Sequence, residues 1–249
     1  MFSWLPQNYP AAFNDLIIPP NLSVWVFAPH PDDFDAVSIT LKKFFNADCR
    51  IYLTVASSGA TRVEDSFCSP PFIQEKALVR EREQTLSCAY FGLPSRRIHF
   101  FRLSEDKNGE IIDNTDNFVK VMNFFLRTEP DVVVMPHGND ENPDHALMYT
   151  FLTRLGGVAT KSFIALLNRD PRTIKMREDI YTYFNETEAA DKGTLLRFHQ
   201  SQQQRNLNTR GIGFDRRILN MNREIAAQHP GRDKYAESFE VEIFKATHN

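Results

Sequence analysis

The feature that most constrains the fold is an apolar run that ends in a histidine and two aspartates. Residues 24–28 read Val-Trp-Val-Phe-Ala, which is typical of a buried strand, and residues 29–33, Pro-His-Pro-Asp-Asp, follow directly. Residues 35–45 carry apolar side chains that favour a helix with one face toward the core. Open α/β sheets hold their ligands outside the carboxyl ends of the strands. This stretch therefore predicts a functional site at the end of the first strand.

The rest of the chain alternates between strand-like and helix-like segments. Strands are expected at 24–28, 50–56, 97–101, 131–135 and 162–167, and helices at 35–45, 73–91, 116–127 and 143–155. This order predicts an α/β fold, a Rossmann-like doubly wound, mostly parallel sheet with helices on both faces. A less regular part follows, with strands expected at 180–184 and 238–244 and helices at 189–205 and 215–227. We interpret residues 1–249 as a single domain, with the core sheet in about 22–170 and a C-terminal elaboration in 171–249.

Composition and charge exclude several classes of protein. The formal net charge of −3 gives no electrostatic reason to expect a nucleic acid partner, and Arg216-Arg217 is interpreted as a solvated face. No apolar run is long enough to span a bilayer, and the N-terminus lacks the pattern of a signal peptide. The three cysteines have no framework spacing, which favours a reducing compartment. We expect a cytoplasmic protein that acts on a small molecule; the sequence leaves open whether it forms homo-oligomers.

A second polar loop follows the strand at 131–135 and ends in His145. If this strand lies beside the first one, as at the switch point of a doubly wound sheet, His145 can reach His30 and Asp33. Two histidines and one carboxylate leave a coordination position open for water, which is typical of a catalytic zinc site. The sequence therefore predicts that His30, Asp33 and His145 bind Zn²⁺ or another divalent metal.

Asp32 lies beside the predicted ligands and is free to move protons. A zinc-bound water loses a proton near pH ~7 instead of ~16, which supplies a nucleophile. Asp32 can take that proton as a general base and pass it to a leaving group. The alternative is structural: Asp32 or Asp33 caps the helix that follows, and Asn142 or Asp144 caps the later helix.

Three further polar residues have two interpretations each. His137 follows the fourth strand and either faces the pocket as a substrate contact or is a loop histidine bonded to backbone. Arg62 lies in a long polar loop and either contacts substrate or points into solvent. His199 is either structural or part of the cleft.

The sequence resembles the PIG-L/LmbE-like superfamily of zinc-dependent N-deacetylases. The first motif of that family, usually Ala-His-Pro-Asp-Asp-Glu, matches residues 29–34, and the second, usually ending in His-Pro-Asp-His, matches residues 142–145. Three further elements match in order: an Arg-x-x-Glu helix at 80–92, a Lys…His…Ser-Gln element at 192–202, and Tyr-Ala-Glu-x-Phe at 235–239. The resemblance runs over most of the chain.

The resemblance implies a function and a set of roles. His30, Asp33 and His145 are implied as zinc ligands, Asp32 as general base and Arg80 as a substrate contact. The implied reaction removes an N-acetyl or other N-acyl group from an N-acetylglucosamine-type amino-sugar conjugate, with a metal-bound water as nucleophile.

Two positions depart from the family pattern. Phe34 replaces the usual Glu, and Asp35 cannot be assumed to substitute for it. Asn142 replaces a histidine that stabilises the transition state in the family, and Asp144, the usual partner of that histidine, would then orient Asn142 or its loop. An Asn amide can donate to an oxyanion but cannot carry a charge, and loss of one such donor typically lowers turnover ~100–1,000-fold.

The departures motivate an alternative, a catalytically impaired sugar-conjugate-binding protein that keeps the fold, with or without the metal. A metal-dependent phosphoesterase is favoured less, because the sequence indicates no second metal cluster for a two-metal site.

Overall fold

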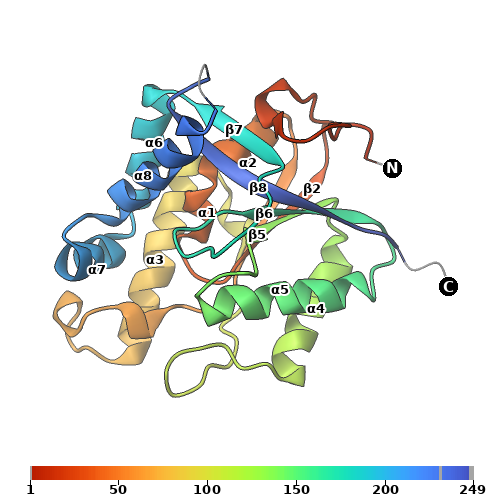
Figure 1. Ribbon diagram of the computed structural model, residues 1–249. Helices are drawn as coiled ribbons and strands as arrows, with labels where there is room; N and C mark the ends of the chain where they lie inside the picture. Colours follow the sequence, from red (N-terminus) through yellow and green to blue (C-terminus); the bar gives the residue numbers. More distant parts are fainter. Residues whose placement is uncertain (1, 230–231, 247–249) are drawn as a thin grey trace.

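The computed structural model describes residues 2–229 and 232–246, and these form one sheet flanked by helices (Figure 1). The strand order is β1-β7-β8-β6-β5-β2-β3-β4. The strands are β1 (Ala11–Ala12), β2 (Ser23–Ala28), β3 (Arg50–Val55), β4 (Ile98–Phe100), β5 (Val132–Pro136), β6 (Phe163–Asn168), β7 (Ile180–Phe184) and β8 (Tyr235–Phe244). The helices are α1 (Asp33–Ala36), α2 (Ser38–Asn46), α3 (Ile73–Phe91), α4 (Thr115–Thr128), α5 (Pro143–Gly156), α6 (Glu186–Arg197), α7 (Gln200–Arg210) and α8 (Phe214–Ala227), with short 3-10 turns such as η2 (Ala60–Arg62). The predicted α/β class is confirmed.

The sheet is mostly parallel and reverses its direction of growth at β2. The chain runs from β2 to β3 and β4 on one side, and then returns to β5 on the other side of β2. In the β2–β5 pair, Val24 lies opposite Val132 and Val26 lies opposite Val134. The predicted adjacency of these two strands is therefore confirmed, and their following loops meet at one edge of the sheet.

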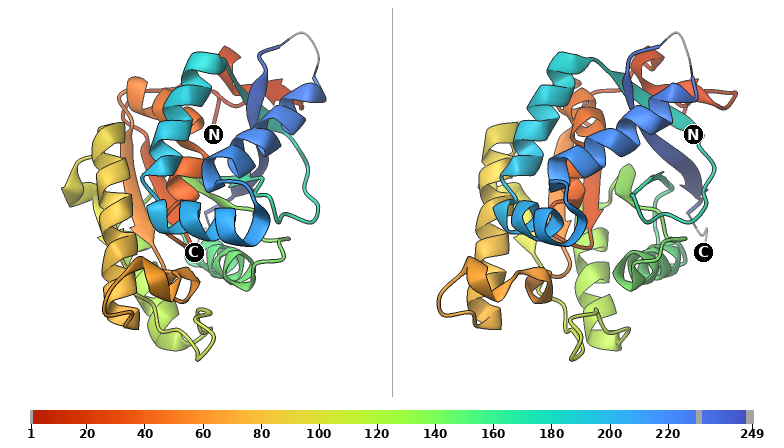
Figure 2. Two further views of the ribbon diagram at one scale, coloured as in Figure 1. Left: turned by 90° about the vertical axis from the view of Figure 1, so that its left-hand side faces the viewer. Right: turned by 60° about the vertical axis from the view of Figure 1, so that its left-hand side comes forward.

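β2 is buried on both faces, which explains its continuous apolar sequence. Val24, Val26 and Ala28 pack in one core with residues of α2 and α3. Trp25 and Phe27 pack in a second core with residues of α4 and α5. Figure 2 shows these two helix pairs on opposite sides of the sheet.

The sheet includes strands that lie before and after the predicted core range of 22–170 in the sequence. β1 precedes that range and pairs with β7, and β8 lies antiparallel between β7 and β6. The sequence predicts strands near β7 and β8 but not their partners, because these pairings join segments far apart in the chain.

No helix in the described part combines the length and apolar composition needed to cross a membrane. Residue 1 and residues 247–249 of the predicted domain lie outside the described residues.

Two predicted helices are each divided in the structure. The segment 35–45 is split at Val37, whose φ of −122° is not helical, into α1 and α2. The segment 189–205 is split before His199, which caps α7 with non-helical dihedral angles. His199 is fully buried, with its Nε2 atom 2.6 Å from the Asp35 carboxylate, and this contact ties the turn between α6 and α7 to α1.

Candidate metal centre and active site

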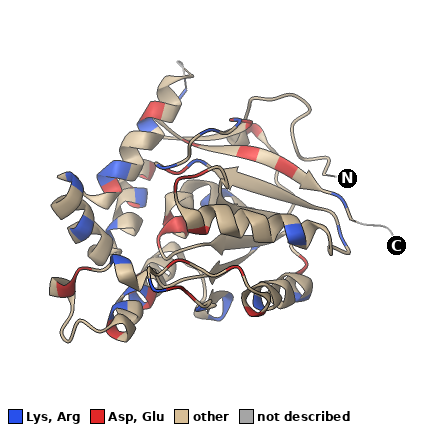
Figure 3. Ribbon diagram, turned by 60° about the horizontal axis from the view of Figure 1, so that its bottom comes forward, with Lys and Arg blue, Asp and Glu red and all other residues tan. Residues whose placement is uncertain are grey.

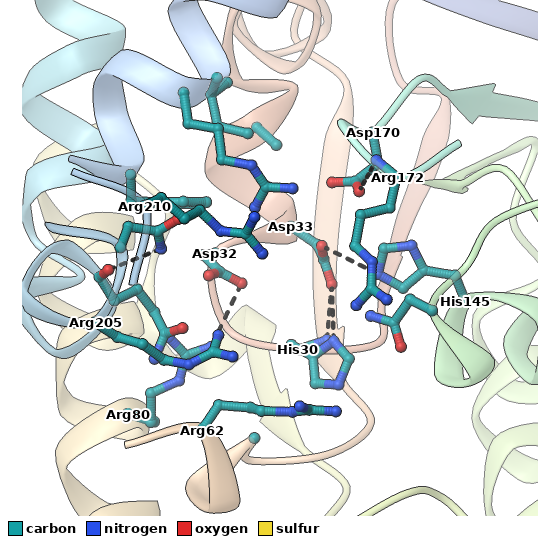
Figure 4. Close-up of a pocket in the computed structure, with 18 residues that line it drawn as sticks. His30, Asp32, Asp33, Arg62, Arg80, His145, Asp170, Arg172, Arg205 and Arg210 are labelled. Atoms are coloured by element: carbon teal, nitrogen blue, oxygen red, sulfur yellow. Dashed lines mark hydrogen bonds and ion pairs between the residues drawn. The ribbon is translucent and has the colours of Figure 1, made fainter. Parts of the chain in front are cut away.

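The structure brings the three predicted metal ligands together at the β2–β5 edge of the sheet (Figure 4). His30 follows β2, Asp33 begins α1 and His145 lies in the first turn of α5. The Nδ1 atom of His30 and the Nε2 atom of His145 each lie 3.8 Å from an oxygen of Asp33. This spacing is too long for a hydrogen bond, but two bonds of about 2 Å to one ion can span it. The donor set therefore fits a divalent metal ion.

The electrostatics of Asp33 and His145 also suit a cation. Burial raises the pKa of Asp33 to about 6, the charge of Asp32 adds to this, and the charge of His145 opposes it. Burial lowers the pKa of His145, but the carboxylates of Asp140 and Asp33 outweigh it and raise the pKa to about 9. Without an ion, a proton on His145 balances the buried carboxylates. A bound cation would take the place of that proton.

Each histidine contacts a second carboxylate through its other ring nitrogen. The Nε2 atom of His30 lies 2.8 Å from Asp144, and the Nδ1 atom of His145 lies 3.5 Å from Asp140. Such outer carboxylates fix the orientation of ligating imidazoles. Asp144 thus contacts His30, whereas the sequence predicts that it orients Asn142 or its loop. The sequence analysis does not single out Asp140. Its one indication in the sequence is its place in the polar loop that leads to His145.

Asp140, His145 and Asp170 form a second group whose ligand atoms could hold a metal ion. No sequence motif indicates this second group, because Asp170 lies far along the chain in the loop after β6. The two groups share His145, whose Nε2 atom faces Asp33 while its Nδ1 atom faces Asp140. A neutral imidazole offers only one ring nitrogen to a metal. We therefore assign Asp140 to the orientation of His145.

Asp32 lies next to the ligands and is held by α3. Its φ of 102° is rare for a residue with a side chain, and such strain is typical of functional sites. Its backbone N–H donates to Gln84 at 3.0 Å, and its carboxylate lies 3.4 Å from Nη2 of Arg80. Arg80 is buried and also donates to the carbonyl of Pro31 at 2.6 Å. Asp32 and Arg80 line the same pocket as His30.

Phe34 points away from the pocket and into the core. It is fully buried and packs edge to face on Phe91, with ring centroids 5.0 Å apart. The neighbouring Asp35 provides a buried carboxylate instead. It accepts from Gln84 Nε2 at 3.2 Å and contacts Nε2 of His199, so it belongs to the network that also holds the Asp32 backbone. His199 does not line the pocket, so the structure favours its structural interpretation.

Asn142 caps α5 and also lines the pocket. Its Oδ1 atom accepts from the Asp144 backbone N–H at 3.2 Å, which confirms the capping alternative for Asn142. Among the residues that the structure describes, its side-chain amide nitrogen donates no hydrogen bond. That donor is therefore available to a bound molecule.

His137 lies outside this pocket. Its Nδ1 atom accepts from the Asn139 backbone N–H at 3.0 Å, and its Nε2 atom lies 3.4 Å from Glu240. It lines a separate hollow beside Tyr149. The structure thus favours the alternative of a loop histidine bonded to backbone.

Arginines dominate the remaining wall of the pocket, and sequence reasoning missed most of them. Six line it: Arg62, Arg80, Arg172, Arg205, Arg210 and Arg217. Figure 4 shows Arg205 and Arg210 on the side of Asp32, and Arg172 on the side of His145. Figure 3 shows Lys and Arg residues on the helices at the left, where α7 lies in Figure 1. The sequence predicts Arg217 to be part of a solvated face; the fold of α7 against α8 turns it to the pocket instead.

Comparisons with known proteins agree with this fold. Residues 25–155, more than half of the chain, match the family model described as PIG-L: GlcNAc-PI de-N-acetylase. No curated protein sequence matches this chain.

Three solved structures illustrate the similarity. N,N'-diacetylchitobiose deacetylase from Pyrococcus horikoshii has a TM-score of 0.73 at 15% identity, with 92% of this chain and 85% of that chain covered. The 4-carboxy-2-hydroxymuconate hydratase GalB from Pseudomonas putida KT2440 has a TM-score of 0.71 at 14% identity, covering 92% and 99%. The zinc-inhibited form of teicoplanin deacetylase Orf2 has a TM-score of 0.67 at 13% identity, covering 89% and 98%. At these identities the likeness is one of fold.

Proposed function

Because the chain belongs to the PIG-L family of GlcNAc-PI de-N-acetylases, we propose that it is a metal-dependent N-deacetylase. Its substrate is an amino-sugar conjugate of the N-acetylglucosamine type, from which it removes an N-acetyl or other N-acyl group. The observation that carries the proposal is that His30, Asp33 and His145 face one another in a pocket that also contains Asp32. A divalent ion, Zn²⁺ first of all, would polarise the acyl carbonyl there and lower the pKa of a water molecule.

Asp32 is the general base of the proposed reaction. It takes a proton from the attacking water and returns it to the departing amine, so that the acyl C–N bond breaks as the new C–O bond forms. Its contacts support this role: Gln84 fixes its backbone and Arg80 stays beside its carboxylate.

Asn142 is the proposed donor to the oxyanion that forms at the acyl carbon. Its Oδ1 atom accepts the hydrogen bond that caps α5, and this bond fixes the side chain. The amide N–H groups of Asn142 therefore point in a fixed direction. A donor that is held in place before the reaction stabilises the developing charge without reorganisation.

The test is acyl release by the zinc-loaded full chain. N-acetylglucosamine and its O-linked conjugates are supplied, and free acetate and free amine are measured together. Asp32→Asn should lower kcat by about 100–10,000-fold with unchanged metal content. A zinc-loaded protein that binds these conjugates but releases no acetate would favour the alternative of a catalytically impaired sugar-conjugate-binding protein.

A second candidate is hydration of an unsaturated carboxylate. The similarity in fold to a hydratase and the arginine-rich pocket wall favour it. Such a reaction would consume the ultraviolet absorbance of a conjugated substrate such as 4-carboxy-2-hydroxymuconate and release no amine. The two candidates therefore give different products in parallel assays.

A further inference from the structure

Four arginines of the pocket form no ion pair in the described part of the chain, although the charges of Asp170 and Asp32 act on Arg217 from farther away. Within residues 2–229 and 232–246, the guanidinium groups of Arg62, Arg205, Arg210 and Arg217 make neither a salt bridge within 4.0 Å nor a side-chain hydrogen bond. The two other arginines differ, because Arg80 lies 3.4 Å from Asp32 and Arg172 lies 3.6 Å from Glu141. We call the four unpaired residues the arginine subsite.

The fold brings three of these arginines to the corner between α7 and α8. Arg205 and Arg210 lie on α7, and Arg217 lies in the first turn of α8. The Gln203 side chain accepts a hydrogen bond from the Phe214 backbone N–H at 2.8 Å, and this bond fixes the start of α8 against α7. A cation in the first turn of a helix is disfavoured by the helix dipole, so helix stability does not account for Arg217.

The charge of the pocket is opposite to that of the whole chain. The chain carries a formal charge of −3, yet six arginines and only three aspartates line this pocket. Burial lowers the pKa of Arg205, and the nearby charges of Arg62 and Arg210 lower it further. Like charges held together in a partly buried pocket repel one another until an anion binds between them.

We propose that the arginine subsite binds an oxyanion with at least two negative charges, a phosphate ester or a pair of carboxylates, carried by the substrate. A guanidinium group can bind either a phosphate or a carboxylate through two parallel N–H···O hydrogen bonds. Figure 4 shows Arg205 and Arg210 on the Asp32 side of the pocket. Since Asp32 returns the proton to the amine, the anion belongs to the amine-bearing product and not to the acyl group. This assignment of the anion rests on the proposed deacetylase function; anion binding itself does not.

The first experiment compares ligands on the zinc-loaded full chain by calorimetry. N-acetylglucosamine 6-phosphate, citrate and neutral N-acetylglucosamine are titrated into the wild-type protein and the Arg205→Gln/Arg217→Gln variant. At least one anion should bind about tenfold or more tighter than the neutral sugar, and the variant should lose that advantage. The anion that binds more tightly shows whether the subsite recognises a phosphate ester or a pair of carboxylates. Arg216→Gln is the control, because Arg216 is exposed on the same helix and does not line the pocket.

The second readout is thermal unfolding without added anion. If the arginines repel one another, the double variant should unfold at the same or a higher temperature than wild type, whereas a structural role predicts a lower one. Equal binding of neutral and anionic ligands, or full anion binding by the double variant, would overturn the proposal. Anion binding without acyl release contradicts the deacetylase function alone. Acyl release with equal kcat/KM on neutral and phosphorylated sugars contradicts the subsite alone.

Discussion

The carboxylate of Asp144 lies 2.8 Å from the Nε2 atom of His30 and links the first turn of α5 to the loop that follows β2. The same carboxylate accepts from the Ile111 backbone N–H at 2.8 Å, so it is held on two sides. With Nε2 engaged in this way, the Nδ1 atom of His30 faces Asp33. Asp144 therefore selects which nitrogen of His30 is offered to a metal.

Asp144→Asn should weaken zinc binding while the fold is kept. The substitution preserves the shape of the side chain but removes the charge that makes His30 a better ligand. The dissociation constant for Zn²⁺ should rise by about 10–100-fold. Competition with a chromogenic chelator measures it, and Asp116→Asn, at an exposed position of α4, is the matched control. Unchanged affinity in Asp144→Asn would show that His30 is oriented without Asp144.

Asn142→Asp separates the two roles of Asn142. Asp caps helices about as well as Asn, so the free energy of unfolding should change by less than about 1 kcal/mol. The amide donor is lost, so kcat for acyl release should fall about 100–1,000-fold. Asn185→Asp, a change at the cap of α6, controls for the cap itself. Wild-type turnover by Asn142→Asp would exclude the donor role.

Phe34→Glu restores the residue usual in the family, yet it should harm this protein. Phe34 is fully buried against Phe91, so the substitution removes aromatic packing and buries a carboxylate. We expect a loss of about 3 kcal/mol or more in unfolding free energy, measured in urea, and no gain in turnover. The conservative control Phe34→Leu should lose less. A rise in kcat with preserved stability would mean that residue 34 faces the site.

Zinc affinity should increase with pH. In the metal-free protein, the pKa of His145 is raised to about 9 and that of Asp33 to about 6. Between these values the ion must displace one proton, from His145, so the dissociation constant should fall about tenfold per pH unit. Below about pH 6 the dependence should steepen, because Asp33 is then protonated as well. Chelator competition at pH 6.0, 7.0 and 8.0 tests the slope, and a flat profile would contradict the raised pKa of His145.

The sequence predicts the parts of this molecule that depend on local patterns. The alternation of strands and helices defines the doubly wound core, and the helix expected at 73–91 coincides with α3. The meeting of His30 and Asp33 with His145 follows from one further rule, that β2 and β5 are neighbours at the switch point.

The other parts depend on tertiary packing that no local pattern specifies. α1 has only four residues and follows the positive φ of Asp32, so the sequence could not tell that Phe34 points inward while Asp35 joins the polar network. The arginines of α7 and α8 have no motif spacing. They gather only because the chain turns at His199 and α8 returns beside α7.

In the proposed metal centre, side chains that follow two neighbouring strands hold one metal ion. The most direct measurement is the metal content of the purified, zinc-loaded and desalted protein by mass spectrometry. Wild type and His137→Ala should retain zinc, because His137 lies outside the pocket. Asp33→Ala and His145→Ala, folded by circular dichroism, should lose nearly all of it. Wild-type zinc content in either of these two variants would contradict the account.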